Sequence, residues 1–136
     1  MLRVLLVEDE ADQRALYRDS FIDAGYQVVT ADSGVEALKC MEAAKPDVIV
    51  LDIQMPGMDG IEALGKLLVH HKDIVVLFYS AYPAFKSNFM TWAADAFVVK
   101  TGDPAEIVDE VNRLLAERGM ISRQDALTGS LKPLKN

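Results

Sequence analysis

The sequence predicts an α/β protein in which a parallel sheet is covered by helices on both faces. Five short apolar runs of strand length alternate with amphipathic helical stretches. The connections are short, and right-handed crossovers of this kind place helices on both sides of a sheet. Four of the apolar runs also end in a charged or hydroxyl side chain, at the end where open α/β sheets hold their sites.

The middle strand organises the chain. Residues Val48–Leu51 form an unbroken apolar run, rich in β-branched side chains, of the kind found in central strands buried on both faces. The run ends in Asp52, and Met55-Pro56-Gly57 then breaks the regular structure. Asp59 can cap a following helix, whose apolar positions are Ile61, Leu64, Leu67 and Leu68.

The elements before the middle strand follow the same alternation. Leu2–Val7 is a strand that ends abruptly in Glu8-Asp9-Glu10, and Tyr26–Ala31 is a more polar run typical of an edge strand. The helix between them ends at Gly25, and its predicted apolar stripe is Leu16, Tyr17, Ser20, Phe21 and Ala24. Ser33 with Glu36 is a capping-box pattern for the next helix, whose predicted apolar side is Val35, Leu38 and Met41.

Two further strands follow the middle one. Ile74–Tyr79 ends in Ser80, and Ala96–Val99 ends in Lys100. Between them, three aromatic residues recur at helical spacing after Pro83, namely Phe85, Phe89 and Trp92.

A last amphipathic helix closes the predicted domain, which covers residues 1–117. Asp103 or Thr101 can cap it, with Pro104 in its first turn. Its apolar stripe is Ile107, Val108, Val111, Leu114 and Leu115. Residues 118–136 lack a sustained stripe, so we expect a C-terminal tail or the start of a linker there, with a short helix possible at Arg123–Leu127.

Length, charge and cysteine content limit the kinds of protein that this sequence can encode. The 136-residue chain is long enough for one domain with a real core, and its formal charge is −7 at pH 7. An acidic chain is a poor nonspecific ligand for nucleic acid, whereas acids gathered in one pocket suit a hard cation. Cys40 is the single cysteine and cannot form an internal disulfide. The sequence contains neither a signal peptide nor an apolar stretch that could span a bilayer, so we expect a cytoplasmic protein without a membrane partner.

The polar strand ends share one edge of the predicted sheet. The carboxyl ends of parallel strands lie together, so Glu8, Asp9, Asp52, Ser80 and Lys100 should converge on one cleft. Three close carboxylates repel one another unless a cation intervenes, and oxygen ligands favour Mg²⁺. A carboxylate beside Mg²⁺, an ammonium group and a hydroxyl donor could accept a phosphoryl group.

These residues resemble the receiver domain of two-component response regulators. The motifs are Val7-Glu8-Asp9, Leu51-Asp52 followed by Met55-Pro56-Gly57-Met58-Asp59-Gly60, Ser80-Ala81 and Val99-Lys100, within residues 1 to about 117. The resemblance implies a doubly wound, five-stranded parallel sheet of order 2-1-3-4-5, the CheY-like (βα)5 arrangement of the flavodoxin-like class. It also implies a signalling phosphoacceptor that catalyses only its own phosphotransfer and autodephosphorylation.

The resemblance also implies roles for individual residues. Asp52 matches the phosphoacceptor and also contacts Mg²⁺, which is held by Glu8, Asp9 and the backbone carbonyl of Gln54. The remaining matches are Ser80 as the Ser/Thr that follows the phosphoryl group, Lys100 as the strand-five lysine, and Phe97 as the aromatic switch residue. Thr101 stands where the family usually has proline, so the Lys100–Thr101 peptide is open to question, and a cis bond there would be costly.

The family resemblance implies partners as well. A sensor histidine kinase or a histidine phosphotransfer protein would donate the phosphoryl group. A downstream protein, or a second copy of the chain, would bind the face made by the helix around Phe85–Trp92, the strand Ala96–Val99 and the last helix. Direct nucleic-acid binding is not expected. The chain is either a single-domain regulator or a piece of a longer one.

Other classes fit the residues less well. A flavodoxin-like cofactor binder would need a phosphate cradle where Glu8-Asp9-Glu10 would repel phosphate. An aspartyl phosphatase of the haloacid dehalogenase kind would have an acid where Gln54 stands. A P-loop NTPase is excluded because the sequence has no G-x-x-x-x-G-K-[ST] motif. The remaining alternative is a degenerate receiver that serves only as a binding module.

Overall fold

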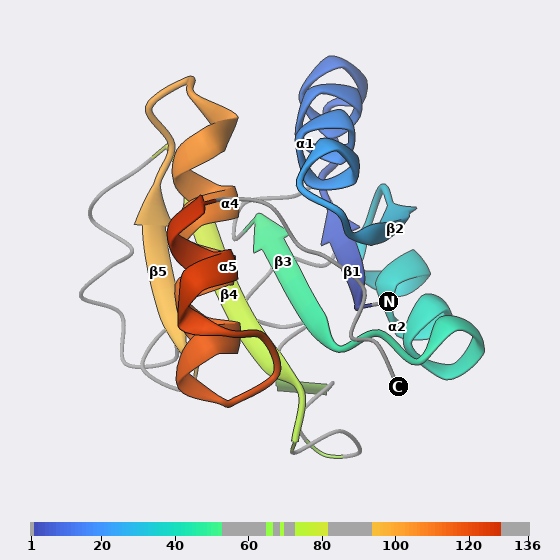
Figure 1. Ribbon diagram of the computed structural model, residues 1–136. Coiled ribbons are helices and arrows are strands. Elements are labelled where there is room, and N and C mark those ends of the chain that lie inside the picture. The colour runs from blue at the N-terminus through green and yellow to red at the C-terminus, as the bar shows by residue number, and fades with distance from the viewer. Residues whose placement is uncertain (1, 53–64, 67–68, 70–72, 82–93, 129–136) are drawn as a thin grey trace.

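The computed structural model describes residues 2–52, 65–66, 69, 73–81 and 94–128. Its strands form one parallel sheet (Figure 1). They are β1 (Arg3–Val7), β2 (Gln27–Ala31), β3 (Val48–Asp52), β4 (Val75–Ser80) and β5 (Ala96–Val99). The helices with described bounds are α1 (Ala11–Asp23), α2 (Gly34–Ala44), α4 (Pro104–Glu117) and α5 (Arg123–Thr128).

The strand order is β2-β1-β3-β4-β5, which confirms the predicted sheet. β3 lies between β1 and β4, with Val50 beside Leu6 on one side and Leu77 on the other. Every residue of Val48–Leu51 is fully buried, as predicted for a central strand. β2 lies at an edge, as its polar sequence indicated.

Two apolar cores cover the two faces of the sheet. The first joins alternate strand residues to α1 and α4, which lie on the same face, and includes Leu6, Tyr17, Phe21, Leu77, Val111 and Leu115. The second joins the other strand residues to α2 and includes Leu5, Ala37, Met41, Ile49 and Phe78. Side chains alternate across the sheet, so the apolar runs supply both cores at once.

Two helices start with the predicted capping chemistry. Ser33 accepts a hydrogen bond from the Glu36 amide at 3.1 Å, as the capping box predicted. Of the two candidates for α4, Asp103 is the cap, and it accepts from the Ala105 amide at 3.0 Å. α1 is capped by Glu10. None of the described residues follows a cis peptide bond, so the Lys100–Thr101 bond is trans.

The prediction that Leu16 and Val35 lie on the buried sides of their helices is wrong. Leu16 is 48% exposed and Val35 is 51% exposed. In α1 the inward face carries Tyr17 and Phe21, which are four residues apart, and Leu16 is rotated by about 100° from that face. The inward face of α2 is made by other residues, so Val35 likewise points away from the core; those residues are Gly34, Ala37 and Met41.

Ion pairs and hydrogen bonds secure the amino edge of the sheet. The Arg3 amide donates to Asp47 at 2.8 Å, which ties β1 to the turn before β3. The Val76 amide donates to Asp95 at 2.8 Å, and Arg118 pairs with the same carboxylate. These two aspartates therefore fasten neighbouring strands at the edge opposite the predicted cleft.

The described residues after α4 pack against the domain. Met120 and Ile121 pack on the first core, and α5 contacts α4. The predicted short helix at Arg123–Leu127 corresponds to α5. The domain boundary near residue 117 and the tail or linker after it stay predictions. No helix within the described residues is long and apolar enough to cross a membrane.

Tyr26→Phe is expected to lower the free energy of unfolding by about 1–3 kcal/mol. The Tyr26 hydroxyl donates to Oδ1 of fully buried Asn112 at 2.5 Å, and Asn112 Nδ2 is already buried without a partner among the described residues. Removing the hydroxyl would leave the whole amide unpaired. Urea unfolding would measure the change, with Tyr17→Phe in the same core as the control. Equal stability of the wild type and Tyr26→Phe would show that the buried hydrogen bond contributes nothing.

Candidate functional site

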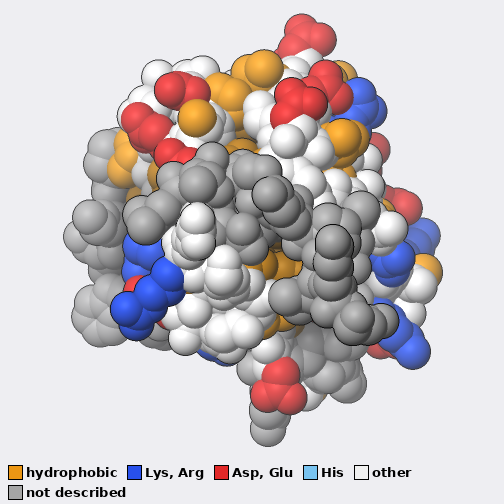
Figure 2. Space-filling model, viewed as in Figure 1, with side chains coloured by type: hydrophobic (Ala, Val, Ile, Leu, Met, Phe, Trp, Pro, Cys, Tyr) orange, Lys and Arg blue, Asp and Glu red, His pale blue; other side chains and the backbone are white. Residues whose placement is uncertain are grey.

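Polar residues from four strand ends lie together at the carboxyl edge of the sheet. Glu8 follows β1, Asp52 ends β3, Ser80 ends β4 and Lys100 follows β5. A pocket of about 200 Å³ opens at this edge, and its lining residues are Asp9, Glu10, Gln13, Asp52, Ser80, Ala81 and Lys100. Figure 2 shows several acidic side chains among apolar ones at the top of the view, over the upper parts of α1 and α4 in Figure 1.

Three carboxylates form the centre of the site. One oxygen each from Glu8, Asp9 and Asp52 can be chosen so that all three lie within 4.8 Å of one another. Glu8 is fully buried and Asp52 is 6% exposed, while Asp9 is exposed. Like charges held this close need a counterion, and an all-oxygen donor set suits a hard divalent cation such as Mg²⁺. The residues present therefore fit a magnesium ion. Gln54, the fourth predicted ligand, lies outside the described residues.

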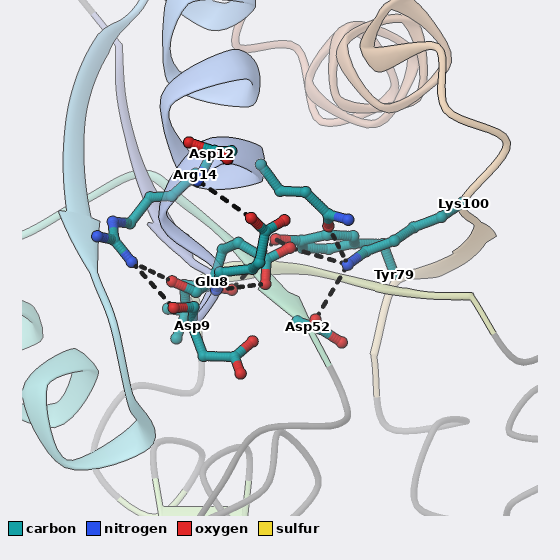
Figure 3. Close-up of polar contacts among 10 residues, drawn as sticks. Glu8, Asp9, Asp12, Arg14, Asp52, Tyr79 and Lys100 are labelled. Atoms are coloured by element: carbon teal, nitrogen blue, oxygen red, sulfur yellow. Dashed lines mark hydrogen bonds and ion pairs between the residues drawn. The ribbon is translucent and has the colours of Figure 1, made fainter.

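Lys100 supplies the positive charge within the pocket. Its Nζ donates to Glu8 Oε1 at 2.8 Å and to Asp52 Oδ2 at 3.0 Å (Figure 3). Its backbone amide donates to the Ser80 carbonyl at 2.8 Å, which fixes the start of the side chain beside β4. One ammonium group cannot neutralise three carboxylates, so the cluster keeps a net negative charge.

The electrostatics of this group shift its titration. Burial raises the pKa of Glu8 to about 7, and the nearby charge of Asp52 acts in the same direction, while Lys100 opposes both. Burial alone would lower the pKa of Lys100, but its hydrogen bond to Glu8 and the charge of Asp52 raise it above 10.5. Lys100 is therefore a fixed cation across the physiological pH range.

Three further residues contribute to the site, although the pattern of polar residues at strand ends did not predict them. The Gln13 side-chain oxygen accepts from Lys100 Nζ at 2.8 Å. Tyr79 lies beneath the pocket, with its hydroxyl 3.2 Å from Glu8 Oε1 and its ring centroid 4.6 Å from Lys100 Nζ. Arg14 donates to the Glu8 carbonyl at 2.9 Å and so holds the loop that carries the first two acids.

The two predicted switch residues differ in their surroundings. Ser80 is fully buried at the end of β4 and lines the pocket. Phe97 is half-buried in β5, pairs with Phe78 in the sheet register and packs against the second core. The predicted aromatic helix around Phe85–Trp92 lies outside the described residues.

The family model described as the response regulator receiver domain matches residues 4–112. The chain belongs to the response regulator receiver domain family. The receiver domain thus accounts for the sheet order and for the acids at its carboxyl edge, and it is a signalling phosphoacceptor rather than a conventional enzyme.

Curated relatives of this receiver domain include longer regulators and a protein of similar length. The chain is 34% identical over 135 residues to the transcriptional regulatory protein PrrA of Mycobacterium bovis, covering 98% of this chain and 58% of PrrA. The chain thus spans little more than half the length of that relative. It is 32% identical over 115 residues to the chemotaxis protein CheY of Thermotoga maritima, covering 82% of this chain and 96% of CheY.

Solved structures agree with this receiver fold. The response regulator TrrA of Thermotoga maritima, solved in complex with Mg²⁺–BeF, is 37% identical, with a TM-score of 0.81 over 85% of this chain and 100% of TrrA. TrrA has also been solved in complex with the histidine kinase ThkA, and that structure aligns with a TM-score of 0.78 at 37% identity, covering 85% of this chain and 99% of TrrA.

Proposed function

We propose that this receiver domain accepts a phosphoryl group on Asp52, in a Mg²⁺-dependent reaction in the cytoplasm, from a histidine kinase or a histidine phosphotransfer protein. The observation that carries the proposal is the position of Asp52. Its carboxylate lies 3.0 Å from the Lys100 ammonium and belongs to the cluster of three acids. An anionic nucleophile, a fixed cation and a set of metal ligands are the components of phosphoryl transfer.

The transfer step uses these groups in defined roles. A carboxylate oxygen of Asp52 attacks phosphorus, a new O–P bond forms, and the P–N bond of the donor phosphohistidine breaks with its electron pair left on the imidazole. Lys100 donates a hydrogen bond to a phosphoryl oxygen, and the Ser80 hydroxyl, which lines the same pocket, binds another. Both donors stabilise charge that the acids alone would repel.

Glu8, Asp9 and Asp52 are the residues proposed to hold Mg²⁺, together with the backbone carbonyl of Gln54. When bound, the ion neutralises negative charge on the phosphoryl oxygens and acts as a Lewis acid. The complex of TrrA with Mg²⁺–BeF, at 37% identity, supports this proposal.

A direct experiment tests the function. The protein is incubated with a small phosphodonor such as phosphoramidate, with and without Mg²⁺, and its intact mass is measured. We expect the mass of one phosphoryl group to appear only with Mg²⁺ and to be lost after mild acid or base treatment, as an acyl phosphate should be. A wild-type protein that never gains this mass would instead indicate a receiver that serves only as a binding module.

Asp9→Ala is expected to weaken Mg²⁺ binding at least about tenfold, because it removes an exposed carboxylate from a site with few ligands. Glu8→Gln should weaken binding less, since the Glu8 carboxylate is already shared with Lys100 and Tyr79. Isothermal titration calorimetry measures both affinities, with exposed Asp12→Asn as the control. Equal affinities for the Asp9→Ala and Asp12→Asn proteins would contradict the assigned metal site.

A histidine kinase is the proposed donor in the cell. The complex between TrrA and ThkA supports this assignment, because TrrA is 37% identical to this chain. The downstream partner is proposed to be a protein, or a second copy of the chain, that binds the face formed by residues 84–100 and α4.

The proposed switch links the pocket to that face. Phosphorylated Asp52 would draw in Ser80, and Phe97 would turn into the space that Ser80 vacates. Phe97 has no hydroxyl, so turning inward breaks no outward hydrogen bond, and full burial of a phenyl ring contributes roughly 1.5–3 kcal/mol. We therefore expect the inward state to be partly populated before phosphorylation.

Hydrogen exchange measured with and without beryllofluoride and Mg²⁺ tests the switch. Amides in residues 84–100 should change their protection, because the Phe97 ring and the adjacent chain move together. Protection changes confined to the Asp52 and Ser80 loops would show that this output surface is wrong.

A further inference from the structure

The Lys100 ammonium has an acceptor for each of its three N–H groups. Two acceptors are the carboxylates of Glu8 and Asp52, at 2.8 and 3.0 Å. The third is the neutral side-chain oxygen of Gln13, at 2.8 Å, which reaches the pocket from the first turn of α1. Lysine side chains have much rotamer freedom, so this full set of partners fixes one position out of many.

An aromatic ring forms the floor under the same ammonium. Tyr79 is fully buried, and its ring centroid lies 4.6 Å from Lys100 Nζ, within the range of a cation–π interaction. The Tyr17 ring packs edge-on against Tyr79 with centroids 5.4 Å apart, which keeps the Tyr79 ring in place. The Tyr79 hydroxyl lies 3.2 Å from Glu8 Oε1, so this residue touches both members of the Lys100–Glu8 ion pair.

We infer that Gln13 and Tyr79 are positioning residues for Lys100, and that they hold its ammonium at the pocket independently of the acids. This inference rests on the proposed function, in which Lys100 donates to a phosphoryl oxygen.

The carboxylate oxygens of Glu8 and Asp52 are shared between two tasks. Glu8 and Asp52 belong both to the Lys100 contacts and to the cation-binding cluster. A divalent cation at that cluster, and a phosphoryl group on Asp52, would each draw on the oxygens that now hold Lys100. Neither the Gln13 amide nor the Tyr79 ring is a carboxylate ligand, so both remain available to the ammonium. They keep Lys100 oriented when its acidic partners are engaged elsewhere, and orientation of a charged donor is what lowers the transfer barrier.

Three variants separate the contacts. Gln13→Met keeps the length of the side chain but removes the acceptor. Tyr79→Leu removes the ring, and Tyr79→Phe keeps the ring but removes the hydroxyl. Exposed Gln124→Met is the matched control for the first, and Tyr26→Phe, a buried tyrosine in the same core, is the control for lost stability. Tyr79→Phe also keeps the test valid if Tyr79→Leu fails to fold.

The first measurement needs neither phosphodonor nor metal. In ¹⁵N NMR spectra of the protein, the Lys100 ammonium protons should exchange with water about tenfold faster in Gln13→Met and in Tyr79→Leu than in the wild type. In Tyr79→Phe the exchange should stay within about threefold of the wild type, because the ring remains. Wild-type exchange in Gln13→Met and Tyr79→Leu would overturn the inference whether or not the protein is ever phosphorylated.

The second measurement is the rate of phosphorylation by phosphoramidate at saturating Mg²⁺. Gln13→Met and Tyr79→Leu should each slow the reaction about five- to tenfold, with Mg²⁺ affinity within about twofold of the wild type. The Gln13→Met change should have no effect when Lys100 is already replaced by Met. An equal slowing in that background would show that Gln13 acts without Lys100 and would overturn the inference. A wild-type protein that takes up no phosphoryl group would instead refute the proposed function, and the exchange measurement would still decide the role of Gln13 and Tyr79.

Discussion

Asp52→Asn is expected to abolish the acid-labile phosphoryl label. Asparagine has nearly the same shape as aspartate but carries no anionic oxygen that can attack phosphorus. Asp52 is 6% exposed and is fixed at the end of the buried strand β3, with Oδ2 3.0 Å from the Lys100 ammonium. Intact-mass measurement after incubation with phosphoramidate and Mg²⁺ should show no gain, against one phosphoryl group for the wild type.

Asp12→Asn is the matched control for this experiment. Asp12 lies exposed in the first turn of α1, close to the site but outside the pocket lining, so its loss should leave the label unchanged. Both substitutions remove one negative charge, which separates the nucleophile from a general charge effect. A label that persists in the Asp52→Asn protein would show that Asp52 is not the phosphoacceptor.

Lys100→Met should slow phosphorylation by at least about a hundredfold, because removing a single preorganised charged donor from a transfer site typically costs that much. The same substitution should raise Mg²⁺ affinity. The ammonium now occupies one oxygen each of Glu8 and Asp52, and its removal frees these two oxygens for the metal. Calorimetry and the labelling rate measure the two effects on one protein.

Exposed Lys39→Met is the control for net charge. It should change neither quantity appreciably, since a charge far from the pocket is screened by salt. If Lys100→Met bound Mg²⁺ more weakly than the wild type, Lys100 would be stabilising the acids in their metal-binding positions rather than competing with the ion.

The fold could be predicted from the sequence because the spacing of apolar residues indicates the helices and strands, and polar residues mark where the strands end. The unbroken apolar run at Val48–Leu51 predicted a strand buried on both faces, and the structure confirms it. The errors at Leu16 and Val35 have one cause. Both are apolar residues beside a helix face rather than on it, and sequence spacing alone does not say which neighbouring positions the sheet will cover.

The sequence also predicted part of the candidate site, but not all of it. Glu8, Asp52 and Lys100 could be predicted as site residues because each is a charged residue that interrupts an apolar pattern where a strand ends. Gln13 and Tyr79 were not visible, because one is a polar residue on a helix and the other an apolar-looking residue within a strand. Their contact with Lys100 depends on how α1 and β4 pack around the carboxyl edge, which is a tertiary arrangement that no local pattern encodes.

The amino and carboxyl edges of the sheet have different roles. At the amino edge, Asp47 and Asp95 are engaged by backbone amides and, for Asp95, by Arg118, so these acids contribute to stability. At the carboxyl edge, acids are crowded around one lysine at a cost in stability, as functional sites commonly are. Asp47 and Asp52 lie at opposite ends of β3, so a substitution that strengthens the contact of Asp47 acts away from the phosphoacceptor. Thermal tolerance gained there during evolution or engineering should therefore leave phosphorylation unchanged, whereas changes at Asp95 would also act on the proposed partner-binding face.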